Sequence, residues 1–241
     1  MPVIAGERYL LPFRPVRTLD RVRVRCGLLA LVVVIAACGS STAAESTSSR
    51  STSATTTEAT GSSLPCGPGT AKTVASDTVA RVYETGGLIY ACARGSGRRY
   101  RLGDARTCVR TERAGPVALS GTTLAYGLES CGVDTGSSSV VVRRLSDGRQ
   151  LRMLPATTAQ LAPESYQLVG SIVVKADGAV AWIGAAKPIF RQSGSVEVHR
   201  ADRRGQAKLD SAPSIEAGSL RLRGSIVTWR HGTGTKSATL L

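Results

Sequence analysis

The chain has 241 residues and carries 31 lysines and arginines against 17 aspartates and glutamates, a formal net charge of +14 at neutral pH. A charge of this size favours anionic partners such as lipid headgroups, acidic wall polymers or nucleic acid. No run of five like charges occurs, which argues against a dedicated polybasic segment and for arginines dispersed over solvated faces.

The N-terminal region carries a basic stretch, Arg21-Val-Arg-Val-Arg25, an apolar run from Gly27 to Ala37, and the sequence Ile35-Ala-Ala-Cys38. The apolar run has 11 residues, about 16 Å as a helix, whereas a membrane span needs roughly 20 residues. Its length suits the apolar region of a secretory signal. Together these features resemble the signal peptide and lipobox of bacterial lipoproteins. The resemblance implies that residues 1–37 are removed, that Cys38 is lipidated, and that the protein is extracytoplasmic and anchored to the bacterial cell membrane.

Two alternatives stay open for this region: plain secretion with Cys38 incidental, and a retained anchor. Residues 1–20 are long for the basic part of a signal and contain three prolines. We therefore expect translation to begin near Val22 or Val24.

Residues 39–63 consist almost wholly of Ser, Thr, Ala, Gly and Glu. Such a segment cannot bury enough apolar surface to offset the entropy of ordering, so 38–63 is predicted to be the lipidated cysteine followed by a disordered linker. A flexible chain of 25 residues has an r.m.s. span of about 25–30 Å. The folded part is expected to run from residue 64 to residue 241.

Six cysteines divide by position. Cys26 lies in the signal and Cys38 in the lipobox. Four cysteines remain in the folded part, and an even number in an oxidising compartment is consistent with two disulfides: Cys66, Cys92, Cys108 and Cys131. Three pairings are possible. Joining sequence neighbours, the first of the four with the second and the third with the fourth, closes the shortest loops and is favoured.

A zinc site is the weaker alternative for these cysteines, because the chain has no C-x-x-C and only two histidines, His199 and His231. No metal or other cofactor is expected.

The folded part shows mostly period-two alternation, which is typical of strands. Two hairpins stand out, each built around an Asp-Gly turn that tolerates positive φ. Strands 140–145 and 150–154 flank Asp147-Gly148, and strands 171–175 and 179–183 flank Asp177-Gly178.

A weak internal repeat places a glycine before an apolar strand that ends in an aromatic residue. Its copies are Gly87 to Tyr90, Gly121 to Tyr126, Gly178 to Trp182 and Gly224 to Trp229. The stretch from Pro116 to Leu154 reads as four strands in about 40 residues, the size of a propeller blade. Alternation predicts these core residues: Leu88, Tyr90, Leu124, Tyr126, Val140, Val142, Val173, Val180, Trp182, Ile226 and Trp229.

The segments Leu119–Tyr126 and Val140–Arg149 resemble the degenerate WD40-like or TolB-like β-propeller repeats of bacterial envelope proteins. The resemblance covers about residues 77–241 and implies an all-β, propeller-like array of antiparallel hairpin blades. At about 45 residues a blade, the folded part supplies about four blades, so the ring is small or incomplete. The chain lacks the Trp-Asp and Gly-His pairs of typical repeats, and an open sheet array or a sandwich stays possible.

Catalytic motifs are not found: no G-x-S-x-G occurs, His199 is expected to be a surface or half-buried strand residue, and His231 lies in a loop. The remaining acidic residues are scattered and expected to be solvated: Glu164, Glu197, Asp202, Asp210 and Glu216. The stretch Arg98-Arg99-Tyr100-Arg101 interleaves arginines with an aromatic ring, so Arg98, Arg99 and Arg101 are candidates for an anionic ligand. The extracytoplasmic address argues against nucleic acid.

The sequence therefore predicts a membrane-anchored, non-enzymatic binding or scaffold module of the cell envelope, whose partner is another envelope protein or an anionic polymer. One alternative is an envelope hydrolase or lyase with its site in the propeller channel, and another is a binder of anionic wall polymers. Convergence of two or more of the scattered carboxylates in one pocket would favour the hydrolase.

Overall fold

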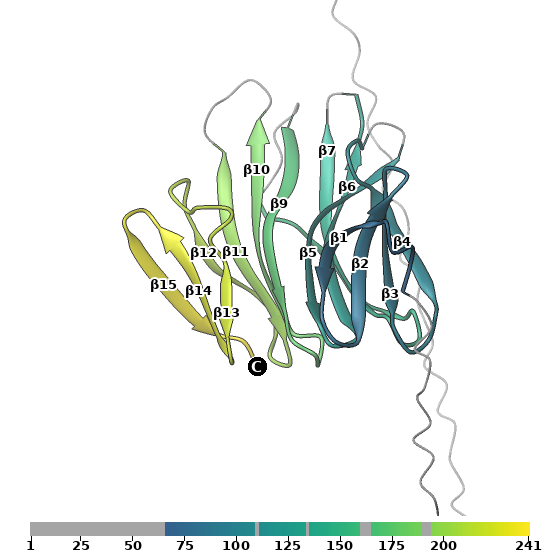
Figure 1. Ribbon diagram of the computed structural model, residues 1–241. Helices are drawn as coiled ribbons and strands as arrows, with labels where there is room; N and C mark the ends of the chain where they lie inside the picture. The colour runs from purple at the N-terminus through teal and green to yellow at the C-terminus, as the bar shows by residue number, and fades with distance from the viewer. Residues whose placement is uncertain (1–65, 109–110, 134, 160–164, 189–193) are drawn as a thin grey trace, which may run out of the picture. The chain divides into compact units, whose positions relative to one another are not determined.

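The computed structural model describes residues 66–241 except 109–110, 134, 160–164 and 189–193 (Figure 1). All of these residues belong to the unit that runs from Glu58 to Leu241. Every regular element among them is a β-strand, which confirms the all-β prediction. In this part of the chain no helix has the length and apolar character to cross a membrane. The signal region, Cys38 and the linker to residue 63 lie outside the described residues, so lipid attachment stays a prediction.

The strands form consecutive antiparallel meanders in chain order. The first meander is β1 (Lys72–Ser76), β2 (Ala80–Thr85), β3 (Leu88–Ala93) and β4 (Arg99–Asp104). The second is β5 (Glu112–Ser120), β6 (Thr123–Cys131), β7 (Gly136–Arg144) and β8 (Gln150–Pro155). The third is β9 (Ser165–Val174), β10 (Val180–Pro188), β11 (Ser195–Asp202) and β12 (Gly205–Ser211). The fourth has three strands: β13 (Arg221–Arg223), β14 (Ile226–His231) and β15 (Gly234–Thr239).

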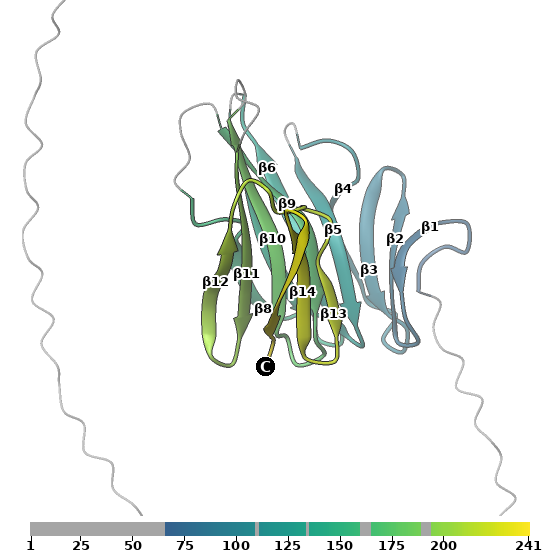
Figure 2. The same ribbon diagram turned by 90° about the vertical axis from the view of Figure 1, so that its left-hand side faces the viewer.

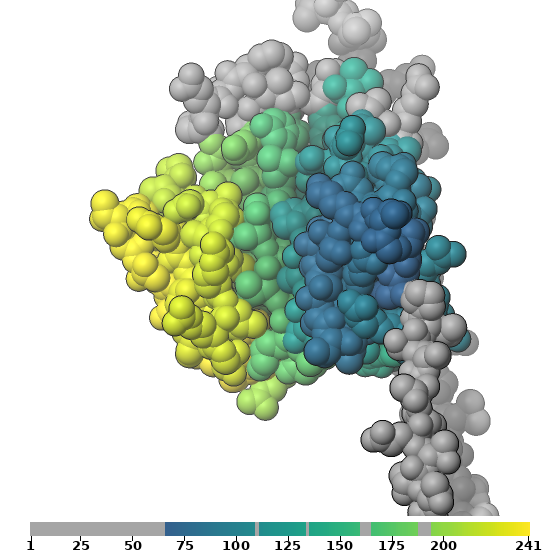
Figure 3. Space-filling view, in the orientation of Figure 1, coloured from purple at the N-terminus to yellow at the C-terminus, as the bar shows by residue number. Residues whose placement is uncertain are grey.

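Single parallel pairs join the first three meanders into one 12-stranded mixed sheet: Asp104 with Arg113, and Gly136 with Tyr166. The fourth meander is a separate three-stranded sheet. In the space-filling view the meanders follow one another from the blue first, through the green third, to the yellow fourth (Figure 3).

Both predicted hairpins are confirmed, as β7–β8 and β9–β10. Gly148 and Gly178 adopt φ of 78° and 91°, the left-handed region that favours glycine. In each turn the preceding aspartate accepts a backbone hydrogen bond of 2.9 Å, Asp147 from the N–H of Arg149 and Asp177 from that of Ala179. These two carboxylates therefore serve the turns, as the sequence indicated.

Alternating side chains of the middle strands fill successive cores on opposite faces. In β6, Leu124 and Tyr126 belong to the core shared with the first meander, and Ala125 to the core shared with the third. In β10, Trp182 belongs to the core shared with the second meander, and Ile183 to the core shared with the fourth. Each inner meander is thus buried on both faces, which explains the apolar character of its strands.

No meander precedes the first one among the described residues, and residues 66–71 cover its outer face. We call these residues the cap segment. The Cys66–Cys92 disulfide joins it to β3, and Tyr83 lies beneath it, 1% exposed. Gly67 is required here, because a Cβ on this residue would lie 2.4 Å from Cζ of Tyr83. The guanidinium of Arg81 donates to the carbonyls of Cys66, Pro68 and Ala71, so the cap segment is fixed at several points.

The cap segment corrects the predicted repeat. Tyr126, Trp182 and Trp229 lie on the second strands of their meanders, each packed in the core shared with the preceding one. Tyr90, however, lies on a third strand, and the residue of the first meander that matches the other three is Tyr83 on β2. Its ring packs against the cap segment, which takes the place of a preceding meander.

Most predicted core residues are buried, with four differences. Leu88, Tyr90 and Val173 are half-buried, and Ile226 is 45% exposed. The prediction for Ile226 is wrong because it lies opposite Arg223 and Thr239 on the outer face of the fourth meander, whereas Val227 and Trp229 face the core. Polar side chains dominate this outer face, as expected for a terminal layer in contact with water.

Candidate binding site between β5 and β9

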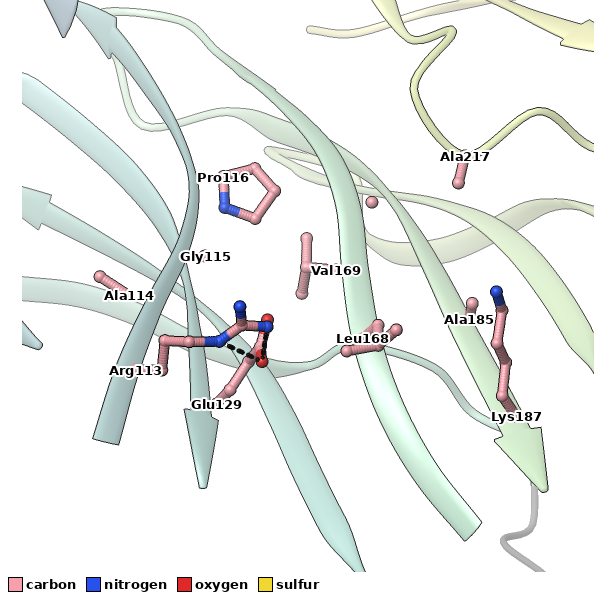
Figure 4. Close-up of a pocket in the computed structure, with 11 residues that line it drawn as sticks. Arg113, Ala114, Gly115, Pro116, Glu129, Leu168, Val169, Ala185, Lys187 and Ala217 are labelled. Atoms are coloured by element: carbon pink, nitrogen blue, oxygen red, sulfur yellow. Dashed lines mark hydrogen bonds and ion pairs between the residues drawn. The ribbon is translucent and has the colours of Figure 1, made fainter. Parts of the chain in front are cut away.

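A hollow of about 380 Å³ lies between β5 and β9, two strands that run side by side (Figures 1, 2 and 4). We call it the β5–β9 pocket. It is lined by Arg113, Ala114, Gly115, Pro116, Glu129, Leu168, Val169, Gly170, Ala185, Lys187 and Ala217. Strands of the second and third meanders contribute ten of these residues, and Ala217 lies in the segment before β13. The volume is at the low end of that of ligand sites.

One wall of the pocket is an ion pair between neighbouring strands. Arg113 on β5 lies directly opposite Glu129 on β6 in the ladder, and its Nε donates to Glu129 Oε2 at 2.9 Å. Its Nη2 donates to the same oxygen. The Glu129 side chain is buried, while that of Arg113 is 34% exposed. A carboxylate at this depth depends on its partner, because an uncompensated buried charge is strongly destabilising.

Lys187 on β10 forms the opposite wall. Figure 4 shows Leu168 between Glu129 and Lys187, so the ammonium group lies apart from the carboxylate. Lys187 is exposed, and no acidic side chain in the described residues pairs with it. Among the described residues, the pocket therefore contains one cation without an acidic partner.

Both strands that border the pocket are irregular there. The β5–β6 ladder skips Gly115 and Pro116, and the β9–β10 ladder skips Gly170. Bulges of this kind occur often beside functional sites, and glycine within a strand commonly marks close approach of another backbone. At Gly170 that backbone belongs to this chain: a Cβ would lie 2.7 Å from that of Ala217.

A second hollow of about 240 Å³ adjoins the first and shares Arg113, Glu129 and Leu168 with it. The Cys108–Cys131 disulfide lines this second hollow. Cys131 lies two residues beyond Glu129 at the end of β6, so this disulfide cross-links the chain close to the ion pair.

Both disulfides, Cys66–Cys92 and Cys108–Cys131, have the pairing that the loop lengths favoured.

The predicted anion ligands lie elsewhere. Arg98, Arg99 and Arg101 are exposed at β4, and no acidic residue of the described chain pairs with them. Arg99 lies opposite Cys92 and Arg101 opposite Tyr90 on the outer face of the first meander. Tyr100 points to the other face, where Arg143 lies 5.7 Å from its ring centre, so the expected stack of aromatic and arginine side chains does not form.

The prediction that Glu197 is solvated is wrong: it is 1% exposed. Its Oε2 accepts from Thr157 Oγ1 at 2.5 Å, from the backbone N–H of Thr158 at 2.7 Å and from His199 Nε2 at 2.9 Å. Lys208 Nζ donates to Oε1 at 3.1 Å. Burial alone would raise the pKa of Glu197, but these donors outweigh it and lower the pKa to about 2.

His199 also differs from expectation, because it is fully buried rather than at or near the surface. Its ring stacks on Trp182 with centres 5.1 Å apart. Burial lowers its pKa despite the Glu197 carboxylate, so the ring is neutral at pH 7 with Nε2 as the donor. Its Nδ1 has no hydrogen-bond partner in the described structure, and the buried position gives a substrate no access.

The carboxylates of Asp202 and Asp210 are likewise covered rather than solvated: their side chains are 0% and 8% exposed, although Asp210 as a whole residue is half-buried. Asp202 accepts from Arg204 and Arg200 and from the backbone N–H of Leu241, and the Arg204 guanidinium holds its pKa well below the usual range. Burial would raise the pKa of Asp210, but hydrogen bonds from His231 and Trp229, both 2.8 Å, lower it. Glu216 is exposed as expected, and Glu164 lies outside the described residues.

None of these three buried carboxylates lines the β5–β9 pocket or the hollow beside it. No group of three or more His, Cys, Asp or Glu in the part of the chain that the structure describes could hold a metal ion. The sequence did not indicate Arg113, Glu129 or Lys187. The only local signal was Gly115-Pro116 within a strand, which is typical of a bulge.

Comparison with known proteins identifies no family. No protein-family model matches the chain, and neither does any curated protein. Among solved structures, the chain is similar to a prolyl endopeptidase at 13% identity with a TM-score of 0.36, over 66% of this chain and 25% of that one. The chain thus spans about a quarter of that enzyme's length, and a likeness this low assigns it no fold family or activity.

Proposed function

We propose that this protein is an extracytoplasmic binding module of the bacterial envelope, anchored by lipid on Cys38, which holds its ligand in the β5–β9 pocket without performing catalysis. The observation that carries the proposal is the pocket itself. It combines a pre-formed hollow, a neutralised ion pair at one wall and, at the other, the cation Lys187, which has no acidic partner in the part of the chain that the structure describes.

The distribution of carboxylates favours binding over hydrolysis. General acid–base catalysis on a glycosidic bond uses two carboxyl groups within about 5–10 Å across a cleft. Glu197, Asp202 and Asp210 each have several donors and lie outside the pocket, and Glu129 in the pocket is held by Arg113. A general base must be free to accept a proton from its substrate, which these occupied groups are not.

The arrangement of the four meanders is a part of the same proposal. We infer that the meanders are blades of a propeller-like array, three complete and the fourth with three strands. Two observations support this: consecutive meanders pack face to face, and an aromatic residue recurs on each second strand. Ligand sites are common where such repeated units converge.

Titration with two probes tests the binding proposal. We expect acetate to shift the amide resonances of Lys187 and Leu168, because a small carboxylate can pair with the free ammonium group. Inorganic polyphosphate serves as the second probe, since Arg98, Arg99 and Arg101 form an exposed cationic edge for which the described residues supply no acidic partner. If polyphosphate shifts only resonances of β4, and if its binding weakens steeply as the salt concentration rises, the protein is instead a binder of anionic polymers. The absence of any shift at the pocket would contradict the proposed site.

Substitution at the lipobox tests the anchor. Cys38→Ala is expected to move the protein from the membrane fraction to the soluble fraction and to abolish incorporation of a labelled fatty acid, since only the thiol at position 38 can carry the lipid. Cys26→Ala is the matched control, because this cysteine lies in the segment to be removed, and it should leave anchoring unchanged. Retention of Cys38→Ala in the membrane, or a mature chain that keeps residues before Cys38, would contradict the proposal.

A further inference from the structure

The two strands that border the β5–β9 pocket each have one edge that is almost unpaired. β5 pairs with β6 along its length, but on its other edge only Arg113 has a partner, in β4. β9 pairs with β10 along its length, and on its other edge only Tyr166 has a partner, in β7. Beyond these single pairs, the described strands leave backbone donors and acceptors of both edges without ladder partners. Such edges can pair with an added extended chain.

The lining of the pocket limits what can enter. Five of its eleven residues are glycine or alanine, and Pro116, Leu168 and Val169 are apolar. This surface admits backbone and small apolar side chains. The volume of about 380 Å³ accommodates a chain end rather than a long segment.

The charges of the pocket limit the ligand further. Lys187 offers one ammonium group that no acidic side chain of the described residues pairs with, whereas Arg113 already donates twice to Glu129. Because Arg113 and Glu129 neutralise each other, that wall offers no free cation for a second negative charge on the ligand. The pocket therefore suits a ligand with a single negative charge, placed at the Lys187 side and separated by Leu168 from Glu129 (Figure 4).

We propose that the β5–β9 pocket binds the carboxyl-terminal end of an extended peptide with small side chains. The terminal carboxylate pairs with the Lys187 ammonium group, and the peptide backbone hydrogen-bonds to the unpaired edge of β5 near its bulge, because Ala217 already lies against the β9 bulge at Gly170. This inference rests on the proposed binding function and specifies its ligand class.

The test compares two peptides that differ only at the end. Calorimetric titration of the full mature chain with Ala-Ala-Ala and with Ala-Ala-Ala-amide should give at least about tenfold tighter binding for the free acid, because the amide loses a charge-assisted hydrogen bond. Lys187→Met should reduce binding of the free acid to the level of the amide and leave the amide unaffected. Lys72→Met is the matched control: Lys72 is also exposed, but lies on β1 and pairs with Glu84. It should change neither affinity.

The outcomes separate the two proposals. Equal affinities for acid and amide, or unchanged binding by a Lys187→Met chain with wild-type thermal unfolding, would overturn the carboxylate assignment. If acetate shifts Lys187 but neither peptide binds, the peptide inference fails and the binding site stands. If neither acetate nor peptide has any effect at the pocket, both fail.

Discussion

Replacement of Trp182 by alanine is expected to destabilise the folded chain by about 4 kcal/mol, the largest loss for any single substitution considered. Trp182 is fully buried between the second and third meanders. Its Nε1–H donates to the carbonyl of Ala156 at 2.9 Å, and its ring stacks on His199. The substitution removes this packing, leaves a cavity in the core, and leaves the Ala156 carbonyl without its donor.

Chemical denaturation measures this loss, and Ile226→Ala is its control. Ile226 was also predicted to be a core residue, but it is 45% exposed on the outer face of the fourth meander. Its truncation should change the free energy of unfolding by no more than about 0.5 kcal/mol. Similar losses for both variants would contradict the layered packing. Trp182→Phe should recover part of the stability, since it restores apolar contacts but not the hydrogen bond.

The second large effect concerns acid stability and Glu197. Its pKa in the folded chain is about 2 against an ordinary value of 4.5. A carboxyl group with a lowered folded pKa contributes stability that is complete above about pH 4.5 and is lost as the pH falls towards 2. The shift corresponds to about 3 kcal/mol. We therefore expect Glu197→Gln to cost about 3 kcal/mol at pH 7, and the difference from the unsubstituted chain to shrink to near zero at pH 2.

Unfolding free energies between pH 2 and pH 7 check this expectation. Asp177→Asn is a control, because Asp177 lies in an exposed turn and its backbone hydrogen bond can be made by asparagine as well. A difference between the unsubstituted chain and Glu197→Gln that does not depend on pH would show that the carboxylate acts through shape rather than charge. His199 adds to acid sensitivity at higher pH: its lowered pKa means that stability declines as the pH falls below 6.5.

Local features were the ones that could be predicted from the sequence. The Asp147-Gly148 and Asp177-Gly178 turns require only their own residues, and the alternating strands beside them follow from period two. The disulfide pairing followed from short loops between neighbouring cysteines. In the first meander the aromatic residue of the repeat was assigned to Tyr90 on β3. The equivalent residue is Tyr83 on β2, which the pattern missed because the glycine of the repeat precedes Tyr90.

The candidate site could not be predicted, because it depends on register and on residues far apart in the chain. Arg113 and Glu129 are 16 residues apart and meet only once the β5–β6 ladder is set. Glu197 was expected to be solvated because its one donor nearby in the sequence, His199, was itself expected at or near the surface. Its donors Thr157 and Thr158 lie about 40 residues away. Burial of a charge is decided by such partners and not by the local pattern.

The cap segment has a mechanical consequence. Any tension applied to the chain before Cys66 reaches the folded part first at the cystine, which passes the load covalently to Cys92 in β3. The strand that follows the cap segment, β1, is by-passed, so its hydrogen bonds with β2 are not pulled apart one after another. Under the proposed lipid anchor, the folded part would resist unfolding strand by strand from its N-terminal end as long as this disulfide stays oxidised.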